Sequence, residues 1–415
     1  MRMRDHVAMG LSLVGLVGVL VSPLHAAMIE ESKVVMPGTM AQDKFGQAVA
    51  IGTDVAIVGA AGHDTPSSNG GAAYVIDLAT GTLTYKLTPT GVASGDSFGG
   101  AVGVSGDVAI VGAIGADSGG AAYLFNVTSG GQLHKLSPSD PTGSDSFGGS
   151  VGIDGDVAVV GAPLHNALGM GNSGAAYVFN VTTGGQSRKL IAGDAFQNDH
   201  FGSAVAVSGD VAVVGAYWDD DKGYHAGSAY LINVTNGSQL YKLTAGDGDA
   251  YDEFGAAVAI CGGVAIVGAP KHDGSAGAAY LFDVATGGLL FKLTADDATA
   301  SDYFGTAVAV CGNAAVVGAP GDDDKGTGSG SVYIFDVTTG LLFDKVLASD
   351  GSNSDSFGGS VGVSMTLGIV GAAEDDSGAL MNTGSAYIFL APEPATVALV
   401  VLGGLAALVR RKRTA

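Results

Sequence analysis

A Phe-Gly pair recurs seven times along this chain, and the residues around each copy keep fixed spacings. Each copy has an Asp two residues before the Phe, a Lys twelve residues before it, a Gly-Ala pair beginning fourteen residues after it, and a Tyr farther on. Only the Gly-to-Tyr interval varies, from 11 to 16 residues, so one loop per copy is free to change length. The seven phenylalanines are Phe45, Phe98, Phe147, Phe201, Phe254, Phe304 and Phe357.

A repeat of about 50 residues is typical of propellers and solenoids, and the local pattern favours strands. In the first copy, short apolar segments at 46–51, 55–60, 72–76 and 83–87 are bounded by Gly, Asp and Thr. Such segments are too short for helices, and the turns between them have hairpin chemistry. Four antiparallel strands per copy predict an all-β fold, a seven-bladed β-propeller over residues 28–390.

The two ends of the repeat region are complementary. Lys33 stands twelve residues before Phe45 with no strands in front of it, whereas the last copy ends after its third strand. We therefore expect the segment Met28–Met36 to supply the outermost strand of the seventh blade and so to close the ring. The repeat lysines would lie on outermost strands, where charge discourages edge-to-edge association.

The first 27 residues have the features of a secretory signal peptide. Arg2 and Arg4 precede an apolar run at 7–21, and small residues follow at Ala26 and Ala27. Export is the expected consequence.

The last residues, 391–415, form a second tripartite segment. A Pro-Glu-Pro motif precedes an apolar run at 396–409 and a basic cluster; the residues that define it are Pro392, Glu393, Pro394, Arg410 and Arg411. This tail resembles the PEP-CTERM sorting signal of Gram-negative bacteria. The resemblance implies secretion through the inner membrane, transient membrane insertion through a short apolar helix, cleavage by an exosortase-type enzyme, and a place at the cell surface or in the extracellular matrix.

The chain is strongly acidic. Its net charge is -22; residues 1–27 carry +1 and residues 396–415 carry +4, so their removal leaves -27. A surface of this sign is unsuited to nucleic acid or anionic lipid and favours cations or neutral and basic partners. Charge that merely keeps the protein soluble is an equal alternative.

The repeat itself resembles a known family. Phe147-Gly148, Gly161-Ala162-Pro163 and the apolar segment 175–179, which contains Tyr177, are similar to the FG-GAP repeat, the blade unit of the integrin α-chain head. The resemblance implies that the loops between second and third strands share one face with the turns between blades, and that this face binds ligand. The family's calcium loop between the first and second strands has shrunk to short hairpins such as 104–107, so its calcium sites are not carried over.

Acidic residues gather instead in the variable loops. Calcium ligands are predicted there among Asp219, Asp221, Asp322 and Asp324, although such loops are also found as solvated turns. The same loop of the fourth copy holds aromatic and polar candidates for contact with a sugar or peptide: Tyr217, Trp218, Tyr224 and His225. An aromatic residue that simply covers its neighbour is the alternative.

Two further features leave alternatives open. Cys261 and Cys311 occupy equivalent positions in adjacent copies, and a disulfide between them is allowed in an exported protein but depends on their separation. The eight His residues are interpreted as scattered, and no zinc-binding spacing is present.

We expect a non-catalytic surface or matrix protein that binds extracellular polysaccharide or a matrix protein. A lyase or hydrolase acting on polysaccharide and a structural matrix protein without ligand are the alternatives.

Overall fold

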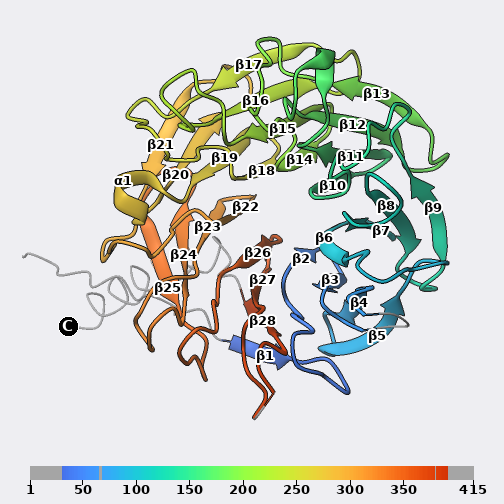
Figure 1. Cartoon of the computed structure of the whole chain (residues 1–415). Coiled ribbons are helices and arrows are strands. Elements are labelled where there is room, and N and C mark those ends of the chain that lie inside the picture. The colour runs from blue at the N-terminus through green and yellow to red at the C-terminus, as the bar shows by residue number, and fades with distance from the viewer. Residues whose placement is uncertain (1–29, 65–67, 379, 391–415) are drawn as a thin grey trace, which may run out of the picture.

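The computed structural model describes residues 30–64, 68–378 and 380–390, and these form a ring of seven four-stranded antiparallel sheets (Figure 1). The predicted seven-bladed β-propeller is confirmed. Within these residues, the only helical elements are two short turns, η1 (Ala167–Gly169) and α1 (His272–Ser275). The signal segment, the Pro392-Glu393-Pro394 motif and the basic cluster lie outside the described residues.

Every sheet has the same strand order from the ring axis outward (Figure 1). The innermost strands are β2 (Val49–Ile51), β6 (Phe98–Ser105), β10 (Val151–Asp154), β14 (Val205–Ser208), β18 (Ala257–Cys261), β22 (Ala307–Cys311) and β26 (Ser360–Val363). The second strands are β3 (Val55–Ala60), β7 (Val108–Ala113), β11 (Val157–Ala162), β15 (Val211–Ala216), β19 (Val264–Ala269), β23 (Ala314–Ala319) and β27 (Leu367–Ala372). The third strands are β4 (Ala72–Asp77), β8 (Ala121–Asn126), β12 (Ala175–Asn180), β16 (Ser228–Asn233), β20 (Ala278–Asp283), β24 (Ser331–Asp336) and β28 (Ser385–Leu390). The outermost strands are β5 (Thr82–Leu87), β9 (Gln132–Leu136), β13 (Gln186–Leu190), β17 (Gln239–Leu243), β21 (Leu289–Leu293), β25 (Leu342–Val346) and β1 (Glu30–Val34).

The second and third strands carry the core. Five consecutive residues of each second strand are buried, as in β15, because both faces of the sheet are covered by the neighbouring blades. Apolar runs without alternation are the expected sequence of such strands. One core cluster illustrates this packing: Val159 and Val178 of the third blade lie against Val214 and Tyr230 of the fourth.

The Gly of each Gly-Ala pair is required by the approach of the next blade. A Cβ built on Gly59 would lie 1.9 Å from the carbonyl oxygen of Gly99, in the adjacent blade. The equivalent glycines meet the same obstacle around the ring, up to Gly371 against Gly46. No side chain fits there unless the backbone moves. The packing of each blade against the next therefore explains why a Gly recurs at this position of the repeat.

The ring closes as predicted. Strand β1 pairs antiparallel with β28 and places Lys33 opposite Tyr387. On the inner side of this blade, Phe45 forms a parallel bridge with Gly384. The first strand of the chain therefore completes the seventh blade.

In the first blade, the Phe-Gly pair lies in a turn that precedes the innermost strand. We predicted a strand from Gly46, but β2 begins at Val49, because Lys44 and Gly46 both adopt left-handed backbone angles. The side chain of Asp43 accepts a hydrogen bond from the backbone N–H of Met40, which is the turn-capping role expected of the Asp in each copy. The Phe45 ring is fully buried and meets the Tyr74 ring edge-on.

Candidate binding face

One face of the ring gathers the most variable segments of the chain. We call it the loop face: the loops between second and third strands together with the turns that link successive blades. Hydrogen bonds join the two sets, for example from the N–H of Tyr251, in the turn after the fourth blade, to the carbonyl of Tyr224 in that blade's loop (2.8 Å). The N–H of Glu253 likewise donates to the carbonyl of His225. The shared face that the family resemblance implied is present.

Five rings on the loop face form a continuous group, which we call the aromatic stack: His200, Trp218, His225, Tyr224 and Tyr251. Trp218 lies between the two imidazoles, with ring centres 4.3 Å from His200 and 4.4 Å from His225. Tyr224 stacks on the other side of His225 at 3.9 Å, and Tyr251 meets Tyr224 edge-on at 5.3 Å. The stack extends from the turn before the fourth blade to the turn after it.

The members of the stack differ in exposure. Tyr224 and Tyr251 are 55% and 58% exposed, so their rings offer an accessible apolar surface. Trp218 is half-buried, and its indole N–H is buried and has no hydrogen-bond partner among the described residues. Tyr217 packs edge-on against His200 and lies within hydrogen-bonding distance of it. Of the four predicted contact residues, Tyr224 is the one presented to solvent, while Tyr217, Trp218 and His225 support it.

Sequence reasoning missed two members of this group. His200 stands between the repeat Asp and Phe201, and Tyr251 lies in the next interblade turn. Both flank a loop that was recognised as aromatic, and both lie in turns that the repeat alignment places on the same face. An inspection of aromatic residues in those turns would have found them.

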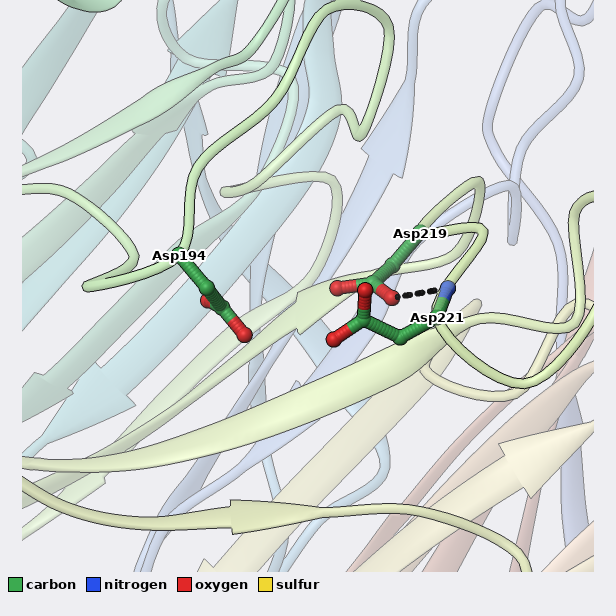
Figure 2. A group of neighbouring side chains, drawn as sticks. All are labelled: Asp194, Asp219 and Asp221. Atoms are coloured by element: carbon green, nitrogen blue, oxygen red, sulfur yellow. Dashed lines mark hydrogen bonds between the residues drawn. The ribbon is translucent and has the colours of Figure 1, made fainter.

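A second feature of the loop face is a group of carboxylates in the fourth blade, Asp194, Asp219 and Asp221. One ligand atom from each lies within 4.8 Å of the others, a grouping that could hold a metal ion. Figure 2 shows Asp194 on one loop and the other two together on another, where the N–H of Asp221 donates to the Asp219 carboxylate. Asp297, Asp322 and Asp324 repeat the arrangement in the sixth blade. The structure thus places the four predicted ligands in two clusters and adds Asp194 and Asp297, from interblade turns.

A lysine already lies within each cluster. The Lys242 ammonium is 2.7 Å from Asp194, 2.8 Å from Asp219 and 2.5 Å from Asp221. Oxygen ligands are those that calcium prefers, but this ammonium contacts all three carboxylates and supplies the compensating charge. Lys345 occupies the same place in the sixth blade, at 2.6, 2.9 and 2.8 Å from its three partners. The geometry fits a lysine counter-ion, which would compete with calcium for the same carboxylates.

These contacts shift the pKa values of the groups involved. Burial alone would lower the pKa of Lys242, but its hydrogen bonds to the three carboxylates outweigh burial and raise it. Burial likewise opposes ionisation of Asp194, yet hydrogen bonds from Lys242 and Tyr230 lower the pKa of this carboxyl group. Both partners are therefore charged near neutrality.

The repeat lysines are more than edge charges, which corrects our interpretation. Each lies opposite the repeat Tyr of its blade, with the ammonium 4.9–5.9 Å from the ring centre in all seven blades. In the seventh blade, Lys33 forms ion pairs of 2.7 Å with both Asp350 and Asp375. In six blades the ammonium group also forms an ion pair with at least one carboxylate, and that of Lys86 in the first blade lies 2.8 Å from Nε2 of His63.

The view that the histidines are scattered is also wrong. His63, His165 and His272 all stand four residues after the Gly of the Gly-Ala pair, the position that Asp219 occupies in its own blade. The Nε2 atom of His272 accepts from Lys292 at 2.8 Å, and its Nδ1 lies 2.7 Å from Asp252. Counting forward from that Gly in all copies would have revealed the recurrence.

Three short segments have the spacing of a serine nucleophile elbow, Gly-x-Ser-x-Gly, at residues 95–99, 148–152 and 358–362. Such an elbow joins a strand to a helix. Here Ser97 occupies the left-handed position of its repeat turn, whereas the hydroxyls of Ser150 and Ser360 donate to the carbonyls of Gly202 and Gly46. Each segment runs into an innermost strand, β6, β10 or β26. All three matches therefore follow from the repeat.

Comparison with known proteins agrees with the geometry. The FG-GAP repeat matches residues 28–76, 82–125, 131–179, 185–232, 238–282, 290–335 and 343–389, one segment for each copy. A search of curated proteins found no match. In the described part of the chain, no helix is long and apolar enough to cross a membrane. The seven matches cover most of the chain, and the protein belongs to the FG-GAP repeat family.

Proposed function

We propose that this protein is a non-catalytic binding module that engages extracellular polysaccharide through the aromatic stack of its loop face. The observation that carries the proposal is the pair of exposed rings, Tyr224 and Tyr251, held by stacked neighbours. Rigid aromatic side chains provide contact area at low entropic cost, and flat rings suit the apolar faces of sugars. FG-GAP propellers are typical of binding and adhesion proteins, which supports the same class of function.

The charge of the protein limits the ligand. The full chain has a net charge of -22, and removal of residues 1–27 and 396–415 leaves -27, so long-range repulsion disfavours polyanionic chains. Neutral or amino-bearing polysaccharides are the class proposed. A basic matrix protein would satisfy the same electrostatics without needing the stack.

The test compares retention of variants on immobilised neutral and amino-bearing polysaccharides. Replacing Tyr224 and Tyr251 together by Ala is expected to weaken binding by tenfold or more, since about 1.4 kcal/mol of lost contact suffices. Tyr241→Ala is the matched control, because Tyr241 is 37% exposed on the outermost strand of the same blade, away from the stack. Equal retention of both variants and the parent protein would remove the stack from the binding site.

The same incubation separates the alternatives. Release of new sugar ends during the binding assay would support a lyase or hydrolase instead. Absence of retention on every polysaccharide and matrix fraction would favour a structural role without ligand.

We further propose that the protein is exported and sorted to the cell surface or matrix of a Gram-negative bacterium by exosortase-type machinery. The support is the order of Pro392-Glu393-Pro394, apolar run and basic cluster at the end of the sequence. Intact-mass measurement of the extracellular protein is expected to show a form without Arg410 and Arg411. A mass that includes Ala415 would contradict the sorting proposal and leave the binding proposal standing.

A further inference from the structure

We propose that Cys261, Cys311 and Met365 form a binding site for a soft monovalent metal ion of the Cu(I) class. The three residues belong to the hairpins between first and second strands in the fifth, sixth and seventh blades. These hairpins lie at the opposite end of the strands from the loop face. The site is therefore independent of the proposed binding function.

The sulfur atoms of neighbouring hairpins are in contact. The Sγ of Cys311 lies 3.6 Å from the Sδ of Met365. The Cys261 thiol interacts with the Cys311 thiol, and Cys261 packs against the core cluster of the sixth blade, which includes Val310. Both cysteines are free thiols and only partly buried, so an ion can reach them.

Met365 is unusual for its position. The residue eight places after the repeat Phe is Gly in the second to sixth blades, as at Gly262 and Gly312, whereas the seventh blade has Met365. The Met365 side chain lies over the neighbouring hairpin, with its sulfur 3.0 Å from where a Cβ of Gly312 would stand. A disulfide would involve only the two cysteine sulfurs, so the presence of the Met365 sulfur beside them favours a metal site.

The donor set selects the metal. Two thiolates and one thioether are soft ligands, which favour Cu(I) over the hard cations that carboxylates bind. Cu(I) binds cysteine as thiolate, so binding of one ion to both sulfurs releases the thiol protons to solvent.

The experiment titrates Cu(I) into tag-free, thiol-reduced full-length protein in competition with a chromogenic Cu(I) chelator, under anaerobic conditions. Retention of one equivalent per chain is expected. The double substitution of Cys261 and Cys311 by Ser is expected to abolish it, and Met365→Leu to weaken it by about tenfold or more, since loss of even an outer-shell partner can cost that much. Met381→Leu is the matched control, because Met381 is also exposed (63%) but lies on the loop face.

Thiol alkylation and competition by a second metal ion provide two further tests of the site. Should the double cysteine variant fail to fold, alkylation of the thiols in the folded parent protein takes its place, with the same expected loss. Ag(I) serves as a probe that cannot change oxidation state and is expected to compete with Cu(I). Complete transfer of copper to the chelator, or retention unchanged in the Met365 variant, would overturn the proposal. The absence of free thiols in protein isolated without reductant would show that a disulfide is formed instead.

Discussion

At the scale of single residues, one position sets which side chain contacts the repeat lysine in six of the seven blades. The fourth residue after the repeat Gly is His in three blades and Asp in three others, for example His272 against Asp219. With Lys292 donating to Nε2, the Nδ1–H of His272 donates to Asp252, which places a neutral ring between opposite charges. An Asp at this position contacts the lysine directly. With either His or Asp at this position, the repeat lysine lies beside the repeat tyrosine of its blade.

The carboxyl group of Asp199 provides a prediction about pH. Burial, reinforced by the nearby charge of Asp219, raises the pKa of Asp199 from its ordinary value to about 7. The unfolded chain loses this proton near pH 4 while the folded chain keeps it to about pH 7, so the contribution of Asp199 to stability falls as pH rises across that window. Asp199→Asn is therefore expected to gain stability relative to the parent between pH 4 and pH 8, by at most about 4 kcal/mol.

Chemical denaturation of both proteins at several pH values provides the measurement. Asn retains an oxygen that can accept from the N–H of Phe196, as Asp199 does. Asp96→Asn is the comparison in the second blade, where the loop offers Ala116 in place of Asp219. A difference between Asp199→Asn and the parent protein that stays constant with pH would contradict the raised pKa.

At the scale of strands and loops, the lysines of the outermost strands take the place of bound cations. Lys242→Met removes the counter-ion of three carboxylates, those of Asp194, Asp219 and Asp221. The Asp219 side chain is almost fully buried. We expect a loss of about 2–4 kcal/mol in the free energy of unfolding, near the cost of breaking a buried pair. Calcium should then restore part of the lost melting temperature, by mass action at the freed carboxylates.

Melting curves with chelator and with increasing calcium measure both effects. Lys135→Met is the matched control, since Lys135 has the same repeat position but pairs with the exposed Asp117, where a surface ion pair is worth about 0–1 kcal/mol. The parent protein is expected to respond to calcium less than Lys242→Met does. An equal or larger response in the parent would mean that calcium binds without displacing the lysine.

Strand positions were predictable from sequence because the buried second and third strands are continuous apolar runs with fixed turns. The residue at which the first innermost strand begins was not predictable from sequence. It depends on the left-handed backbone angle of Lys44, whose turn is hydrogen-bonded to the adjacent blade: the Lys44 N–H donates to the Asn382 carbonyl. The candidate site was predictable only in part for the same reason. Trp218 was identified, but its stacking on His200 and the contact of Lys242 with Asp194 join segments whose proximity depends on how blades pack.

At the scale of the whole molecule, closure joins the two ends of the repeat region and makes the blades interdependent. Strand β1 covers the outer edge of β28, and its Lys33 is the counter-ion of Asp350 and Asp375. Val34 and Met36 are also buried in the cluster shared by the first and seventh blades. Loss of this one segment therefore exposes a strand edge, opens a core cluster and leaves two carboxylates without their ammonium.

Deleting the residues before Gly38 from the mature chain is accordingly expected to lower the melting temperature of the entire ring, because each blade depends on its neighbours for burial. Lys33→Met separates the causes: it removes the ion pairs but keeps the strand, so it should lower the melting temperature by less than the deletion. Adding the missing segment as a free peptide should recover part of the loss, since it can pair again with β28. A deletion variant that melts at the temperature of the parent would show that the ring is stable without its closing strand, and that the pairing of Lys33 with Tyr387 contributes nothing to it.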